Sequence, residues 1–175
     1  MDELLTLDKI LELPNKILKI SNEYDDYSER LTESLCDLYD IKKLKPKIVS
    51  LFNRFKKVKY FYNFSIESTI SITPNYNFDG TLVKNGATSK QEIAVANELD
   101  NMLWAARFYN SICIVAKKLT MQEAIYLVSA LFGNKSEEII AERLGVCRKT
   151  IQHIKKSCLV KIWQELKPLY EEDNN

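Results

Sequence analysis

The sequence has little glycine and little proline, four residues of each among 175. Turn-rich β-folds depend on these residues, so their scarcity favours long regular elements, and helices in particular. Long apolar runs are also missing, since no run is longer than that of Ile112–Ala116, which is far shorter than the roughly 20 residues of a membrane-spanning helix. The N-terminus lacks the pattern of a signal peptide. We expect an all-α protein of the cytoplasm that has no membrane partner.

Residues that carry chemistry are scarce as well. The four cysteines form no CxxC pair, and the single histidine, His153, has no neighbour at the spacing of a metal ligand. A glycine-rich phosphate loop and a nucleophile–base constellation are absent from the sequence. We therefore expect no catalysis, no metal site and no cofactor.

Charge of either sign is nearly balanced overall, with a formal net charge of +1, but it is divided into blocks. Residues 1–41 carry a net charge of −7, whereas residues 42–59 hold eight bases and no acid. A further stretch, residues 143–164, contains six bases and no acid. Such asymmetry indicates binding to nucleic acid or to a partner. We expect the acidic segment to screen or fold against the 42–59 block, which leaves the helix after Arg148 as the main positive surface.

Apolar spacing predicts a helical N-terminal region over residues 1–61. A first helix starts near Leu4 and is expected to end or kink at Pro14, because proline removes a helical hydrogen bond. A second, amphipathic helix is predicted over Asp25–Leu44, and a third follows Pro46 and carries the basic block.

Turn residues predict an irregular linker over residues 62–88, in which a short strand or hairpin fits. Ser89 and Glu92 have the spacing of a capping box, which opens a long connecting helix over residues 89–118. The C-terminal domain, residues 119–170, follows it.

Three helices are predicted in this C-terminal domain. Thr120 and Glu123 form a capping box for the first, and Gly133-Asn134 ends it. Ser136 caps the second, whose residues Ile139, Ile140 and Leu144 face inward. The third begins at Arg148 and runs until Pro168.

The spacing of four residues, Ala141, Gly145, Ile151 and Ile154, along the chain predicts a helix-turn-helix. Ala141 is small enough to let two helices approach closely, and Gly145 supplies the positive φ that a tight turn needs. Ile151 and Ile154 then seat the second helix. Placed on a helical wheel, the exposed face of that helix carries residues suited to reading DNA bases, namely Lys149, Gln152, His153 and Lys156. Residues expected nearer the DNA backbone are Arg148, Thr150, Lys155 and Lys161.

The segment from Leu119 to Lys167 resembles region 4 of sigma-70-type factors. Its central part reads EIIAERLGVCRKTI, residues 138–151, with Cys147 at the position where a serine usually caps the recognition helix. With the preceding linker, the layout resembles ArpU/RinA-type phage late-gene transcriptional regulators. This resemblance implies binding to double-stranded promoter DNA and contact with bacterial RNA polymerase, in a bacterial cytoplasm and from a phage or prophage gene.

Other functions remain open. Val160 and Trp163 continue the exposed face of the third helix, which fits a protein-interaction module. A phage terminase small subunit also joins a DNA-binding helical domain to an oligomerising one, so a role in DNA packaging is a further alternative. The Phe52–Phe64 stretch interleaves aromatic and basic residues, and it fits either an amphipathic helix over a core or a contact with nucleic acid or polymerase. Self-association into a homo-oligomer is left open.

Overall fold

The computed structural model describes residues 5–68 and 90–173, which form seven α-helices and no strand. The helices are α1 Leu7–Tyr24, α2 Glu33–Asp37, α3 Ile41–Ser68, α4 Lys90–Lys118, α5 Met121–Leu127, α6 Glu137–Leu144 and α7 Arg148–Asp173. A short 3₁₀ turn, η1 (Asp25–Tyr27), follows α1, and a π-helical turn, η2 (Val128–Phe132), extends α5. The all-α prediction is confirmed. None of the helices in the described ranges has both the length and the apolar character that a membrane crossing requires.

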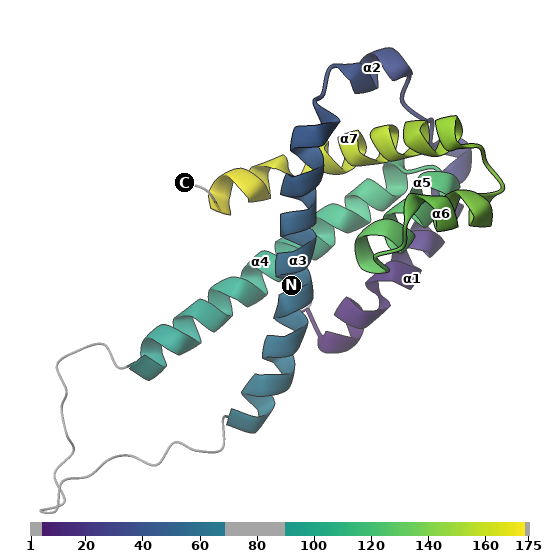
Figure 1. Ribbon diagram of the computed structural model, residues 1–175. Helices are drawn as coiled ribbons and strands as arrows, with labels where there is room; N and C mark the ends of the chain where they lie inside the picture. Colours follow the sequence, from purple (N-terminus) through teal and green to yellow (C-terminus); the bar gives the residue numbers. More distant parts are fainter. Residues whose placement is uncertain (1–4, 69–89, 174–175) are drawn as a thin grey trace, which may run out of the picture.

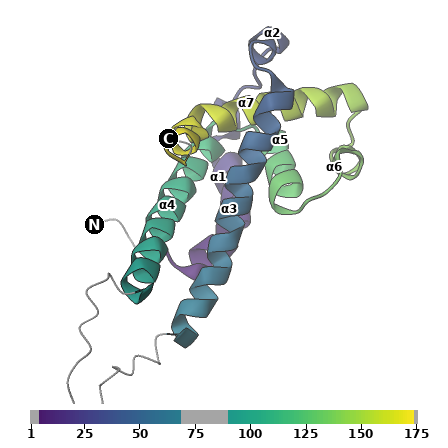
Figure 2. The ribbon, with the colours of Figure 1, turned by 60° about the vertical axis from the view of Figure 1, so that its left-hand side comes forward.

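One hydrophobic core is shared by the N-terminal and C-terminal helices. α3 and α4 approach one another and extend away from α6, as Figures 1 and 2 show. At the centre of the core, the Phe108 ring of α4 stacks on Phe55 at 4.6 Å and meets Phe52 edge-on at 5.1 Å. Because both phenylalanines are buried, this part of the Phe52–Phe64 stretch is an amphipathic helix over a core.

The two helices that proline was expected to shape continue through it. We expected α1 to end or kink at Pro14. Pro14 lies inside the helix, so the prediction of a helix end at this residue is wrong. A proline inside a helix costs about 3 kcal/mol, but complete burial of Leu13 and Ile17 stabilises the helix by about 1.5–3 kcal/mol per side chain. Pro168 likewise lies inside α7, which continues to Asp173 and buries Leu169.

The predicted helix over Asp25–Leu44 is wrong. This segment contains η1, an extended stretch and α2 before α3 begins at Ile41. Bonds to distant residues hold it open: the Asp25 carboxylate accepts a hydrogen bond from the Met121 N–H at 2.7 Å, and the Leu31 N–H donates to Ser157 Oγ at 2.9 Å.

Of the two helices that flank the predicted linker, α3 is longer than expected and α4 has about the expected length. α3 continues to Ser68, beyond the start of the linker predicted over residues 62–88, and it also begins before Pro46. α4 confirms the long connecting helix as far as Lys118. The predicted strand or hairpin and the N-cap Ser89 fall in residues 69–89, outside the described residues.

Candidate nucleic-acid interface

The start of α5 has the predicted capping box. The Thr120 hydroxyl accepts from the Glu123 N–H, and the Glu123 carboxylate accepts from the Thr120 N–H at 2.9 Å. α5 ends through η2, where the Gly133 N–H donates to the Val128 carbonyl at 2.9 Å. A Cβ at Gly133 would lie 2.9 Å from the Ser129 carbonyl oxygen, so glycine is needed for this close approach.

The turn between α6 and α7 is short, and its capping bonds and backbone conformation are those predicted from the sequence. Ser136 caps α6, with its hydroxyl 3.5 Å from the Ile139 N–H. Gly145 has a φ of +63°, and the Val146 N–H donates to the Ala141 carbonyl at 3.0 Å. Apart from its two chain neighbours, no described residue has an atom within 4 Å of a Cβ built at Gly145, so this position requires glycine for its backbone conformation rather than for space.

The framework residues seat α6 and α7 on the core. Ile151 is 2% exposed and Ile154 is fully buried, while Ala141 is partly buried and packs against the same core. The side chain of Ile140 also points inward and is fully buried. Ile139 is 52% exposed, so its predicted inward orientation is wrong; on α6 these neighbouring residues cannot share one face.

The N-terminal end of α7 carries the most accessible of the predicted DNA-binding residues. Arg148 and Lys149 are exposed, and Thr150 is half-buried in the same turn. Figure 2 shows this end of α7 with α6 beside it, at the side of the molecule away from the C-terminus. The backbone N–H groups of this first turn also favour a negatively charged ligand.

Two further predicted residues form a bridge between α6 and α7. The Lys155 ammonium pairs with the Glu137 carboxylate at 2.8 Å, and the Gln152 amide donates to the same carboxylate. Burial raises the pKa of Glu137, but the hydrogen bonds from Lys155 and Gln152 and the charges of Lys155 and Lys45 together outweigh it, so the net pKa lies below the ordinary value. Glu137 therefore stays ionised and holds both side chains in place.

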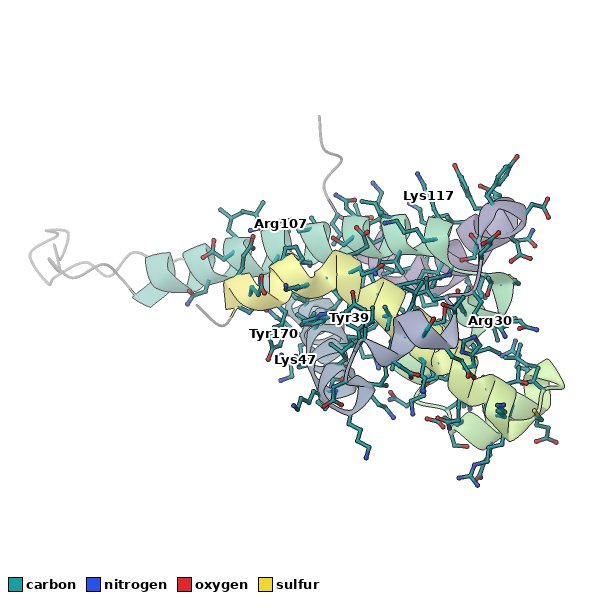
Figure 3. The ribbon with its side chains drawn as sticks, turned by 90° about the horizontal axis from the view of Figure 1, so that it is seen from above. Arg30, Tyr39, Lys47, Arg107, Lys117 and Tyr170 are labelled. Carbon is teal, nitrogen blue, oxygen red and sulfur yellow. The ribbon has the colours of Figure 1, made fainter. Side chains whose placement is uncertain are left out.

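His153 and Lys156 lie on the same face, and both are half-buried. His153 Nδ1 is buried without a hydrogen-bond partner. Lys156 pairs with Asp37 of α2 at 3.1 Å. Seen from above in Figure 3, α2 lies across α7. The acidic N-terminal segment thus contacts the predicted recognition helix through α2. It also meets the 42–59 block, because α1 packs against α3 and Asp40 pairs with Lys43.

Lys161 is not available for a DNA backbone, and this prediction is wrong. Its side chain is 6% exposed and its ammonium reaches the fully buried Glu123 carboxylate at 2.8 Å. The same ammonium donates to the backbone carbonyls of Glu29 at 2.6 Å and Lys118 at 2.8 Å. All three of its N–H groups are therefore used inside the protein.

The predicted partner surface on α7 is also wrong. Val160 is 1% exposed and Trp163 is 8% exposed. The Trp163 ring packs against Tyr170 at 5.5 Å, and the Lys47 ammonium lies 5.4 Å from its centre; Figure 3 shows Lys47 beside Tyr170. The helical wheel of α7 could not predict this burial, because the wheel considers one helix alone and α3 covers this face in the folded protein.

Sequence reasoning missed two contributors to this surface. Arg143 is exposed near the C-terminal end of α6, and its place in the acid-free 143–164 stretch is the signal that could have included it. Asp37 was counted only as part of the acidic block, and no local signal places it on α7.

Among the described residues, no three metal-ligating side chains gather. Comparison of the chain with models of known protein families, with curated proteins and with solved structures finds no match. The functional assignment therefore rests on the geometry of this site.

Proposed function

We propose that the protein is a sequence-specific DNA-binding transcription regulator that inserts the N-terminal part of α7 into the major groove. The observation that carries this proposal is the arrangement of the α6–α7 pair, which supports a helix-turn-helix: α6 is capped, Gly145 is left-handed, and Ile151 and Ile154 seat α7 on the core. An exposed cationic first turn at the start of α7 adds the charge that phosphate binding needs.

The burial of the side chains refines their proposed roles. Arg148, Lys149 and Arg143 are exposed and suit contacts with phosphates. Gln152 and His153 are half-buried and lie one turn further along, where base edges would approach. Lys155 acts by fixing Glu137 and Gln152 rather than by contacting DNA.

The resemblance to sigma region 4 and to phage late-gene regulators supports promoter DNA as the target and bacterial RNA polymerase as a partner, in the bacterial cytoplasm. The full chain is tested in a binding-site selection from random duplex DNA, with and without polymerase. We expect one enriched sequence. Enrichment without polymerase would identify a free-standing regulator, whereas enrichment only with polymerase would identify a sigma-like role.

No enriched sequence under either condition would contradict the proposal. Capture of a terminase large subunit rather than polymerase would instead favour the DNA-packaging alternative.

The contact residues are tested by substitution with controls on the same helix. Lys149→Gln should lower the slope of log affinity against log salt by about 0.9, because one phosphate contact is lost. Lys167→Gln, which changes the same charge at the far end of α7, should leave the slope unchanged. Gln152→Ala should relax the selected sequence, with Gln164→Ala as its control. If each variant had the same effect as its control, the proposal that this face of α7 contacts DNA would be contradicted.

A further inference from the structure

A cleft of about 520 Å³ lies between α3, η2 and the α6–α7 pair. Its volume falls within the roughly 300–1,000 Å³ of typical small-molecule sites. Its walls are largely apolar and come from all these elements: Val49 of α3, Ala130 and Leu131 of η2, Ala141 of α6, and Ile151 and Leu159 of α7. The cleft therefore presents an apolar interior that the helices leave open.

A hydroxyl group without a partner lies in this apolar wall. Tyr126 of α5 is 2% exposed and lines the cleft, and its hydroxyl makes no hydrogen bond to any described residue. Burial raises the pKa of the Tyr126 phenol well above its ordinary value, so the hydroxyl keeps its proton and remains a donor. Because no protein atom accepts from this hydroxyl, it can donate to water or to a ligand that enters the cleft.

The cleft also carries an excess of positive charge. Lys45 of α3, Lys135 before α6 and Arg148 of α7 line it, and within the described residues none of their side chains forms an ion pair or a hydrogen bond. The Glu137 carboxylate at the cleft is already held by Lys155 and Gln152, and the charge of Lys45 also acts on it. Only Glu138, which is exposed, opposes the three cations as an unpaired acid in the lining.

We infer that this cleft binds a small organic anion with an apolar body, of the aromatic carboxylate or sulfonate class. The apolar walls bury the body of the ligand, the lysine and arginine side chains attract its anionic group, and the Tyr126 hydroxyl donates to an oxygen that enters the cleft. This site goes beyond the proposed function, and its binding is measured without DNA.

The test uses 8-anilinonaphthalene-1-sulfonate, an aromatic sulfonate whose fluorescence rises in an apolar site. The folded full chain should bind one molecule saturably, with a Kd of about 0.1 mM or lower. Its uncharged analogue, N-phenyl-1-naphthylamine, should bind more weakly. Absence of saturable binding up to about 1 mM, or binding of several molecules per chain, would overturn the inference.

Variants then place the probe in the cleft. Lys135→Gln and Arg148→Gln should each raise the Kd about threefold or more, whereas Lys42→Gln, an exposed change on α3 outside the cleft, should not. Ala130→Leu should fill the cleft and abolish binding. Tyr126→Phe, which keeps the ring, should weaken binding of the probe.

Thermal unfolding shows whether each variant is folded. If Ala130→Leu is not folded, the two exposed charge variants decide the outcome. Unchanged affinity in those two variants would overturn the inference.

One consequence rests on the proposed function. Arg148 and Gln152 both line the cleft and belong to the proposed DNA surface, so a bound anion should compete with phosphate and lower DNA affinity. If the probe binds the cleft but no DNA sequence is selected, the proposed function fails and the anion site stands. If a DNA sequence is selected but the probe does not bind, the anion site fails and the proposed function stands.

Discussion

Cys147 lies at the position before α7 where its side chain meets the first turn of that helix. Its Sγ is 3.2 Å from the Thr150 hydroxyl. Hydrogen bonds from that hydroxyl and from the Thr150 N–H lower the pKa of the Cys147 thiol. Burial instead raises the pKa of the thiols of Cys36, Cys113 and Cys158. The four cysteines therefore differ in both access and ionisation.

Cys147 should be the first cysteine that iodoacetamide alkylates in the folded protein, because the thiolate is the reacting form. Since its pKa is lowered, half of its maximal rate should be reached at a lower pH than for an ordinary cysteine. Thr150→Val should move this profile to higher pH, and Thr32→Val should not. Peptide mass analysis over a pH series measures this. Earlier labelling of another cysteine would contradict the expectation.

The buried pair of Lys161 and Glu123 should govern stability rather than DNA binding. Lys161→Met leaves the Glu123 carboxylate buried without a cation, which costs about 3–5 kcal/mol. The exposed Lys167→Met should change the free energy of unfolding by less than about 0.5 kcal/mol. Urea denaturation compares the two variants. A loss below about 1 kcal/mol for Lys161→Met would show that the pair is not an essential contact of the core.

At the scale of elements, α2 is the part of the molecule that restricts the proposed DNA surface. Asp37 neutralises Lys156, and the pair is partly exposed, with side-chain exposures of 64% and 39%. An exposed pair is worth about 0.2–1 kcal/mol. DNA must replace this contact before it can use Lys156.

Asp37→Asn should therefore raise DNA affinity about two- to fivefold at low salt, and the gain should shrink as salt screens it. Asp8→Asn makes the same charge change on α1 and serves as the control. Fluorescence anisotropy with the selected duplex measures both. A gain that is no larger than the control would mean that α2 does not oppose DNA binding.

The elements that the sequence predicted well are those whose ends depend on neighbours in the chain. Thr120, Ser136 and Gly145 each act on backbone groups within a few residues, so their spacing alone locates the helix ends. The segment after Tyr24 is different, because the atoms that hold it belong to Met121 and Ser157. Helical periodicity carries no information about such distant partners, and the burial of Trp163 was missed for the same reason.

At the scale of the whole molecule, α1 ties the candidate DNA-binding part to the rest of the protein. Its residues Ile17 and Leu13 are fully buried in the shared core, and the Ser21 hydroxyl donates to the Ala116 carbonyl at 2.8 Å. This connection changes what removal of the acidic segment should do. Deletion of residues 1–41 would remove the negative charge of the acidic segment, but it would also remove these core side chains, so we expect the shortened chain to lose its folded structure.

The same connection predicts that residues 119–173 do not fold alone. Leu119, Leu127 and Ile162 are fully buried in a core that also contains side chains of α1, α3 and α4, and Lys161 would lose its bond to the Glu29 carbonyl. Exposure of each such apolar side chain costs about 1.5–3 kcal/mol, which exceeds what a short helical segment can replace. Circular dichroism of the isolated segment should show no cooperative thermal transition, whereas the full chain should show one. A cooperative transition at the temperature of the full chain would instead establish residues 119–173 as a unit that folds on its own, with the N-terminal helices added to its surface.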